Sequence, residues 1–350
     1  MKNSVKSLSA NGSERLKYIE SAKGIGIFLV LIGHHIKGGP ALVSWINSFH
    51  MPLFFIITGW LDCIRPEGVA HGSDLWSYAK KKAKSLLWPY CTFSAINLLW
   101  LTGYYLFFGV QPEEPFPVVW IKMITTYGYH ALWFLPAMFC ASVINRWAGR
   151  IAPKMTLTLS LVMASGISLY LECFTEPEIL WYILIYIGRV SIAVSYVGLG
   201  KLFFHFLNRL RTSRAIVLAC ICFAVHLLLF RLVPQQNMSL AKMTNIPLSY
   251  LLGCVGSIGV ILLCKHLPLL SNNRILSYAS RNSLIILALH MDVSIELAWM
   301  VLGIAGFSAV LSMFQASVIA VGIECVILWG CIICIRKFLP FLLRFPEKQH

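Results

Sequence analysis

The chain has 350 residues, of which 58% are hydrophobic and 12% charged, and its formal net charge is +15. Soluble domains usually carry about a quarter charged residues, so this composition excludes a soluble enzyme and a disordered chain. The positive charge does not indicate nucleic-acid binding, because the basic residues stand singly or in small groups between apolar runs. A mean hydropathy of +0.74 and repeated runs near membrane-spanning length predict an all-α polytopic integral membrane protein.

The apolar runs predict about ten transmembrane helices. They are expected at 20–36, 43–62, 86–110, 118–145, 155–172, 179–200, 215–233, 246–267, 282–302 and 306–335. The fourth is expected to be interrupted near Gly128. The predicted organisation is a cytoplasmic segment over 1–18, a membrane domain over 19–336 and a cytoplasmic tail over 337–350. No short apolar core with a small-residue cleavage site precedes the first span, so we expect no cleaved signal peptide.

Basic and acidic connectors alternate along the chain. The bases are Arg65, Lys80, Lys81, Lys82, Lys84, Arg146, Arg150, Lys154, Lys201, Arg209, Arg211, Arg214, Arg274 and Arg281, and the acids of the alternate connectors are Glu113, Glu114, Glu172, Glu176 and Glu178. Cytoplasmic loops carry an excess of Lys and Arg. The alternation therefore predicts an even number of spans with both termini in the cytoplasm.

The first span carries two ionisable residues on one face. Lys23 and His34 are separated by about three helical turns, so both side chains project from one side of the helix, with a rise of about 16 Å. Lys23 is then near the cytoplasmic surface and His34 deeper, toward the outer half. His35 points about 100° away from this face. We expect the face to line an internal cavity.

The two residue types suit a transfer reaction. Imidazole accepts a proton from a hydroxyl near neutral pH, and a cation at the cytoplasmic mouth suits a phosphorylated substrate. The structural alternative is that Lys23 marks the inner interface and His34 makes a helix contact. Charged groups within membrane helices are costly, which makes each one a candidate functional residue.

Four segments of the sequence resemble motifs of the membrane-bound acyltransferase-3 family, in particular its fucose 4-O-acetylase-like branch. Lys23 and His34 match a basic residue, ten residues and a histidine in the first span. The segments FHMPLFFIITG at 49–59, WFLPAMF at 133–139 and NSLIILALH at 282–290 are similar to later helix motifs. They occur in the family's order over most of the chain.

The resemblance implies an acyl-CoA-dependent O-acyltransferase that acts on a sugar hydroxyl of a cell-surface polysaccharide or its lipid-linked precursor. Acetyl-CoA is the expected co-substrate, with no permanently bound cofactor. His34 is the expected general base in a direct transfer. Lys23 stands where most members have Arg, and KKAK at 81–84 replaces a cytoplasmic Arg-x-x-Arg. Lys23, Lys81, Lys82 and Lys84 are the expected contacts of the CoA phosphates.

Further candidates lie deeper in the predicted membrane. His50 and His290 are expected to assist catalysis, and Arg189 to stabilise the thioester oxyanion or bind CoA. Asp292 and Glu296, about one turn apart, and Trp133 are expected to contact the sugar. Helix packing and interfacial anchoring are the structural alternatives for these side chains.

Other classes of site and protein are less well supported. No His, Cys, Asp or Glu spacing predicts a metal site, and most cysteines lie within apolar runs as small hydrophobic residues. The expected partners are acyl-CoA, a glycan acceptor and membrane lipid. The main alternative is a transporter or flippase of lipid-linked saccharide, which should show internal repeats or paired broken helices. No clear repeat is visible. A polymerase or a non-enzymatic partner subunit is a further alternative.

Overall fold

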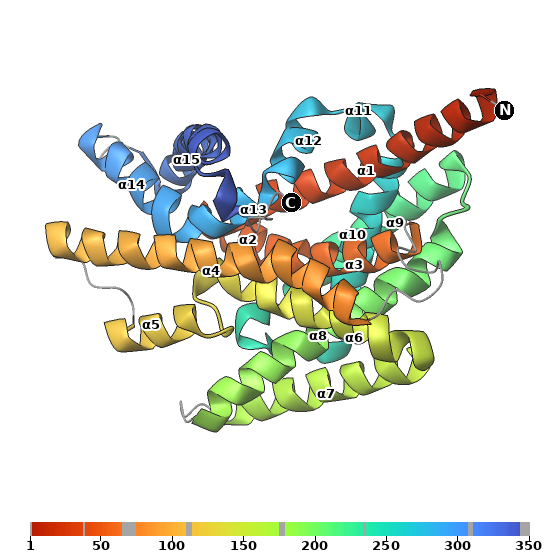
Figure 1. Ribbon diagram of the computed structural model, residues 1–350, viewed down its shortest axis with the longest axis horizontal. Coiled ribbons are helices and arrows are strands. Elements are labelled where there is room, and N and C mark those ends of the chain that lie inside the picture. Colours follow the sequence, from red (N-terminus) through yellow and green to blue (C-terminus); the bar gives the residue numbers. More distant parts are fainter. Residues whose placement is uncertain are drawn as a thin grey trace, which may run out of the picture.

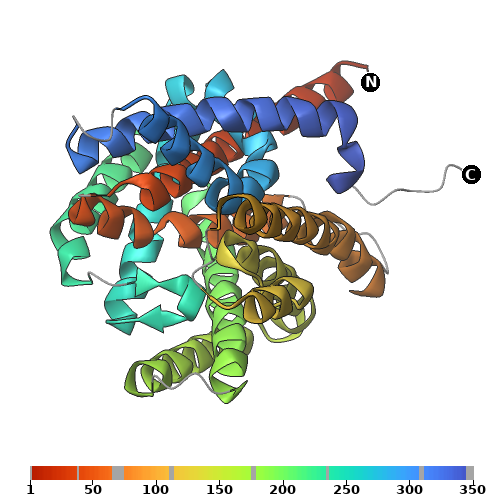
Figure 2. The same ribbon diagram turned by 90° about the vertical axis from the view of Figure 1, so that its left-hand side faces the viewer.

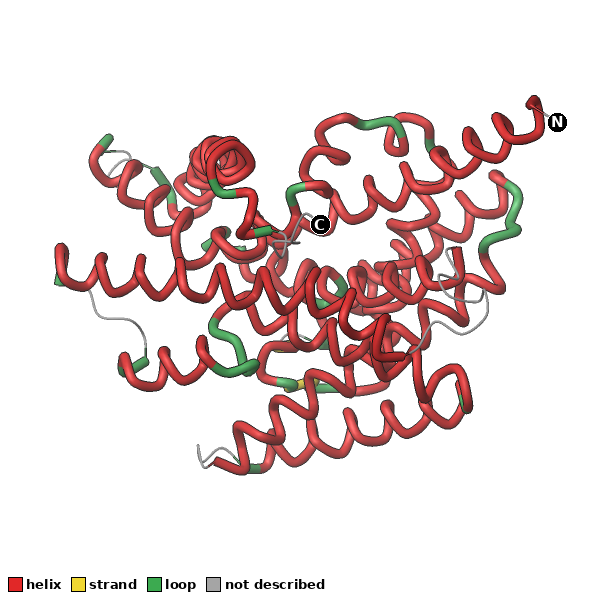
Figure 3. Tube along the Cα trace, viewed as in Figure 1, coloured by secondary structure: helices red, strands yellow, loops and turns green. Residues whose placement is uncertain are grey.

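The computed structural model describes residues 2–37, 39–64, 75–109, 114–174, 179–233, 236–306 and 311–343, with side chains from residue 17 onward. The described chain is almost entirely helical, and two short antiparallel strands pair between two of the helices (Figure 3). The predicted all-α polytopic membrane fold is confirmed. Arg65, Glu113, Glu176 and Glu178, which contributed to the predicted orientation, lie outside the described residues.

The elements follow one another in a simple order. They are α1 (Lys2–His35), α2 (Pro40–Asn47), α3 (His50–Ile64), α4 (Leu75–Phe108), α5 (Phe116–Ile124), η1 (His130–Trp133), α6 (Phe134–Ile151), α7 (Pro153–Cys173), α8 (Ile179–Leu207), α9 (Thr212–Leu229), η2 (Phe230–Leu232), β1 (Gln236–Asn237), η3 (Met238–Leu240), β2 (Lys242–Met243), α10 (Ile246–His266), α11 (Pro268–Ser271), α12 (Arg274–Arg281), α13 (Ser283–Leu289), η4 (His290–Ser294), α14 (Ile295–Ile304), α15 (Met313–Phe338) and η6 (Pro340–Leu342).

Within the described ranges, eight helical segments are long and apolar enough to cross a membrane. They coincide with the second, the third and the fifth to tenth predicted spans. The first predicted span is the end of the longer α1, where Lys23 and two histidines reduce the hydropathy. The fourth is divided between α5 and α6. The total of ten spans and the cytoplasmic location of the termini stay predictions.

The fourth predicted span is broken where the sequence indicated. The helix α5 ends at Ile124, Gly128 has a φ of +78°, and η1 begins at His130, whose φ is +43°. A Cβ at Gly128 would collide with the backbone of Trp133, so only glycine fits this turn. Positive φ is uncommon for a residue with a side chain and often accompanies a functional site.

The ninth predicted span is also irregular. Between α13 and α14, the turn η4 (His290–Ser294) is a π-helix, and π-helical turns within α-helices frequently occur at functional sites. The predicted start of the tenth span at 306 was wrong. Ser312 caps α15, since its hydroxyl accepts the Gln315 amide N–H and the Gln315 side chain accepts the Ser312 N–H.

The helices α1, α3, α8 and α10 pack at the centre of the molecule (Figures 1 and 2). The helix α3 is buried over most of its length and packs against α8 and α10. The helix α12, which the sequence analysis did not predict, packs on α1, where the Leu276 carbonyl occupies the space that a side chain at Gly24 would need. The helix α15 is seen nearly end-on in Figure 1 and lengthwise in Figure 2, so it crosses α4, α6 and α8 steeply.

Candidate active site

A cavity of about 230 Å³ lies between α1, α3, α4, α6 and α13, and two cations line it. Lys23 of α1 and Lys82 of α4 share this cavity with Asp62 and Ser85. Asp62 is also 3.2 Å from the Lys201 ammonium, so its negative charge is partly offset. Lys23 and Lys82 therefore line one cavity, whereas Lys81 and Lys84 are not among the residues that line it. The contacts of these four lysines with CoA phosphates stay predictions.

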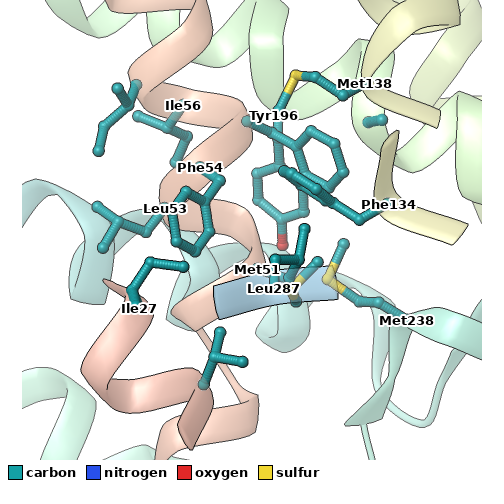
Figure 4. Close-up of a cluster of buried hydrophobic side chains, with 14 of the residues drawn as sticks. Ile27, Met51, Leu53, Phe54, Ile56, Phe134, Met138, Tyr196, Met238 and Leu287 are labelled. Atoms are coloured by element: carbon teal, nitrogen blue, oxygen red, sulfur yellow. The ribbon is translucent and has the colours of Figure 1, made fainter. Parts of the chain in front are cut away.

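The other end of this cavity is apolar. Ile27, Met51, Phe134 and Leu287 line it, and Figure 4 shows these four side chains within one buried cluster. Each of them is close in the chain to a candidate catalytic element. Ile27 precedes His34 by two turns of α1, about 10 Å, Met51 follows His50, and Phe134 follows η1. His34 is not among the residues that line this cavity, so the expectation of one cavity bordered by both Lys23 and His34 is met only at Lys23, and apolar side chains close the end nearer to the histidines.

Three of the predicted histidines lie together at this depth. The His34 and His290 ring centroids are 5.2 Å apart, and His50 lies within electrostatic range of His34. The Nδ1 atoms of His50 and His290 are each 2.9 Å from a backbone carbonyl, of Ile46 and Leu287 respectively. A carbonyl can only accept a hydrogen bond, so each Nδ1 carries the hydrogen. In the neutral ring, Nε2 then has a free lone pair.

His34 differs from its neighbours in exposure. His50 and His290 are buried, as is His35, but His34 is exposed. An exposed imidazole next to buried ones borders space that a small molecule can enter. Among these histidines, His34 therefore has the best access to a reacting hydroxyl.

A fourth histidine, which the sequence analysis did not select, joins the cluster. His130 of η1 places its Nδ1 atom 2.6 Å from Asp292 Oδ1, and the Asn97 amide of α4 is 2.6 Å from Asp292 Oδ2. His34 and His290 both lie within electrostatic range of His130. The carboxylate fixes Nδ1 as the donor and leaves Nε2 as the basic atom, as in the histidine–carboxylate pairs of hydrolases. A signal existed in the sequence: His130 follows the Gly128 break and precedes the motif at 133–139.

A second buried carboxylate lies behind His34. Glu324 of α15 has one carboxylate oxygen 3.2 Å from His35 Nε2, and Ser294 of η4 donates a hydrogen bond to the other at 2.9 Å. All three side chains are fully buried. This contact ties the end of α1 to the π-helical turn and so fixes His34 relative to His290. Glu324 was not among the residues predicted from the sequence, although a carboxylate in a strongly apolar helix is itself a signal.

Arg189 supports the broken helix rather than the cavity with the two lysines. Its guanidinium donates to the carbonyls of Ser239 and Tyr127, at 2.5 and 2.7 Å, and it lies over the rings of Tyr127 and Trp133. It does not line that cavity. These contacts hold the segment that carries His130. The predicted contact of Arg189 with CoA stays a prediction.

We expect Arg189→Met to lower the free energy of unfolding by about 1–3 kcal/mol, because two partly buried carbonyls lose their donor. Transfer activity should fall as well, since His130 loses its support, while acyl-CoA binding should be retained. Arg231→Met, at an exposed position of η2, is the control and should change stability by less than about 0.5 kcal/mol. Thermal unfolding in detergent and calorimetry with CoA measure both quantities. If the Arg189→Met protein had normal stability but no longer bound CoA, Arg189 would instead belong to the acyl-CoA binding site.

Glu296 and Trp133, the other two predicted sugar contacts, do not lie with Asp292 in the histidine cluster. The π-helical turn rotates the chain between Asp292 and Glu296, so that Asp292 is buried and Glu296 is exposed on α14. Trp133 is buried, and its ring contacts Arg189 and Phe134. Of the predicted acceptor contacts, only Asp292 lies with the histidines. In the described part of the chain, no three His, Cys, Asp or Glu side chains meet as metal ligands would.

Comparison with known proteins gives one match. The model of the acyltransferase-3 family, which is described as an acyltransferase domain, matches residues 16–336. This range contains the two lysines of the cavity, the four clustered histidines and both buried carboxylates. No curated protein and no solved structure matches the chain.

Proposed function

The chain belongs to the membrane acyltransferase-3 family, and from that premise we propose that it moves an acyl group from cytoplasmic acyl-CoA to a saccharide hydroxyl. Acetyl is the proposed acyl group, and the acceptor is a cell-surface polysaccharide or its lipid-linked precursor. Acyl-CoA is a co-substrate rather than a resident cofactor. The proposed location is the bacterial inner membrane. The assignment to the fucose 4-O-acetylase-like branch stays a prediction.

One observation carries the proposal: a single helix joins a cavity lined by two lysines to a cluster of histidines. Lys23 lines the cavity and His34 contacts His290, with a rise of about 16 Å between them along α1. The phosphates of CoA are anionic and its pantetheine arm is slender and extended. Phosphate contacts at Lys23 and Lys82 would place the thioester near His34, past the apolar side chains of Ile27 and Leu287.

His34 is the proposed general base. It takes the proton of the acceptor hydroxyl as the oxygen forms a bond to the thioester carbonyl carbon. The carbon–sulfur bond then breaks, and CoA leaves toward the cytoplasm as a thiol once it has gained a proton. Holding donor and acceptor at one histidine removes much of the entropic cost of their meeting. No covalent acyl-enzyme is required.

The pair of His130 and Asp292 offsets the positive charge that develops on His34. In this tautomer Nε2 is the atom of His130 that can be protonated, and Asp292 balances the charge if a proton moves to it from a neighbouring imidazole. His50 and His290 keep their Nε2 lone pairs for the acceptor hydroxyl or for His34. The buried Asp292 carboxylate is costly in a membrane, and this role explains why it is present.

One observation is also compatible with the transporter alternative. The fourth and ninth predicted spans are both broken, and the breaks η1 and η4 pack against each other. Discontinuous helices that meet near mid-membrane are typical of transporters. Membership of an acyltransferase family and the chemistry of the side chains at these breaks favour transfer. Covalent labelling of a glycan by radioactive acetyl-CoA separates the two functions.

We expect the purified protein to move labelled acetyl from acetyl-CoA to de-esterified surface glycan of its source cells. Lys23→Ala should raise the KM for acetyl-CoA roughly 10-fold or more, because a charged contact to phosphate contributes about 1.5–3 kcal/mol. The KM for the glycan should stay within about 2-fold. Lys154→Ala, at an exposed position of α7, is the control. Absence of labelled glycan with the wild-type protein would reject the function, and equal changes in both KM values would make Lys23 structural.

A further inference from the structure

A second cavity, of about 640 Å³, opens between the α1–α2 corner and the β1–η3–β2 hairpin. Figure 2 shows the hairpin close to α2 on the side of the molecule turned to the viewer, and α2 contacts β1. The hairpin connects α9 to α10 and the corner connects α1 to α2, and both connectors alternate with the basic, cytoplasmic ones in the predicted orientation. By the predicted orientation, the cavity faces the outer side. Its volume lies within the range of small-molecule sites.

The side chains that line this cavity combine hydrogen-bonding groups with small apolar surfaces. Asn47, Gln236, Asn237 and Lys242 supply amides and an ammonium, and Ile36 and Val43 supply apolar contacts. The cavity of Lys23 and Lys82, by contrast, joins two cations to an apolar end. Amides both donate and accept hydrogen bonds, which suits hydroxyl groups, and apolar side chains suit the C–H faces of a sugar ring.

Gln236 gives an independent indication of a ligand. The residue is 9% exposed, and its Nε2 atom has no hydrogen-bond partner among the described residues. A buried donor without a partner destabilises the folded protein unless a ligand or solvent satisfies it. Its neighbour Asn237 is different, since its Oδ1 accepts from Ser239 Oγ and from the Leu240 amide and so shapes the turn.

The elements around this cavity also carry the histidines. Ile36 directly follows the end of α1, two residues after His34, and Asn47 is at the end of α2, directly before the short link to His50. The turn η3 packs against η1, which carries His130, and Arg189 ties η3 to the same segment through Ser239 and Tyr127. A molecule in this cavity would lie next to the histidine cluster on the side opposite to Lys23.

We propose that this outer cavity is the acceptor subsite, and that Asn47 and Gln236 bind the hydroxyl groups of a saccharide. The inference rests on the proposed function, which it deepens by assigning the acceptor's binding residues. The cavity holds one sugar of the acceptor. The neighbouring sugar of the same chain is the one that is acylated, and its hydroxyl lies at His34. Lys242 provides a further donor at the rim. A phospholipid headgroup is the competing occupant, but an amide-lined site with one ammonium favours hydroxyls over a phosphate.

The test measures saccharide binding and donor binding separately. De-esterified glycan fragments from the source cells are added to the protein in detergent, and binding is followed by saturation-transfer NMR, while CoA binding is followed by calorimetry. The variants are Gln236→Leu and Asn47→Leu. The matched control is Asn272→Leu, which removes an exposed amide at the predicted cytoplasmic end. Thermal unfolding shows that each variant is folded, and two variants are used so that misfolding of one does not end the test.

We expect each variant to bind the fragments up to roughly 10-fold more weakly, the effect of one lost hydrogen bond to a side-chain amide. CoA binding should be unchanged, and the control should match the wild type. Fragment binding that both variants retain would overturn the subsite while leaving the transfer reaction intact. Fragment binding by a wild-type protein that transfers no acyl group would reject the function but keep the cavity. Binding of glycerophosphate in place of glycan would also overturn the subsite.

Discussion

Replacing His34 with alanine should reduce acyl transfer by about 10²–10⁴-fold, the usual contribution of a general base. The imidazole is exposed, and its ring centroid is 5.2 Å from that of His290. It follows Ile27, which lines the cavity of Lys23, by two turns of α1. Its removal should leave the helix in place, because alanine is a good helix former. CoA binding should be retained. Transfer of labelled acetyl by purified protein measures the loss.

The matched control for this variant is His205→Ala. His205 is exposed at the end of α8 that the orientation places in the cytoplasm, so its loss should change neither stability nor transfer. A His34→Ala protein with more than a tenth of wild-type activity would remove His34 from the role of base. The rate would then have to be explained by His130.

Replacing Asp292 with asparagine should reduce transfer by about 10²-fold or more, because the amide cannot balance a charge on His130 and favours the other tautomer. His130→Ala should have a similar effect. The double variant should be no worse than either single one, because the two side chains act as a unit through their 2.6 Å contact. Single-turnover rates of the three variants complete the cycle.

Asn97→Asp is informative beside this pair, since Asn97 donates to the other oxygen of Asp292 at 2.6 Å. A second carboxylate there would repel Asp292, so activity should fall while His130 is intact. If the reductions in transfer rate from His130→Ala and Asp292→Asn multiplied in the double variant, His130 and Asp292 would not act together. Independent losses of that kind would indicate that Asp292 binds acceptor directly and that His130 has a separate role.

Much of the fold could be predicted from the sequence, because lipid imposes strict length and hydropathy on a spanning helix. Eight predicted spans coincide with long apolar helices. The break near Gly128 could also be anticipated, since glycine is unfavourable within a helix. The helix α12 could not be, because it is short and its packing on α1 depends on tertiary contact with Gly24.

The site was harder to predict than the fold. Lys23 and His34 were found because helical periodicity relates residues of one helix. His130 and Glu324 were missed because their partners, Asp292 and His35, come from distant parts of the chain. Asp292 and Glu296 were expected on one face of a regular helix, and the π-helical turn at His290–Ser294 separates them. Such a turn has no periodic signature in the sequence.

The most direct test of a transfer reaction based on His34 is NMR of the surface glycan from cells that carry a single copy of the gene. Cells with the wild-type copy should show O-acyl ester signals, and cells with His34→Ala should lack them while the variant protein is present in the membrane at normal level. Cells with His205→Ala should match the wild type. Ester signals of normal intensity in the His34→Ala cells would contradict the account.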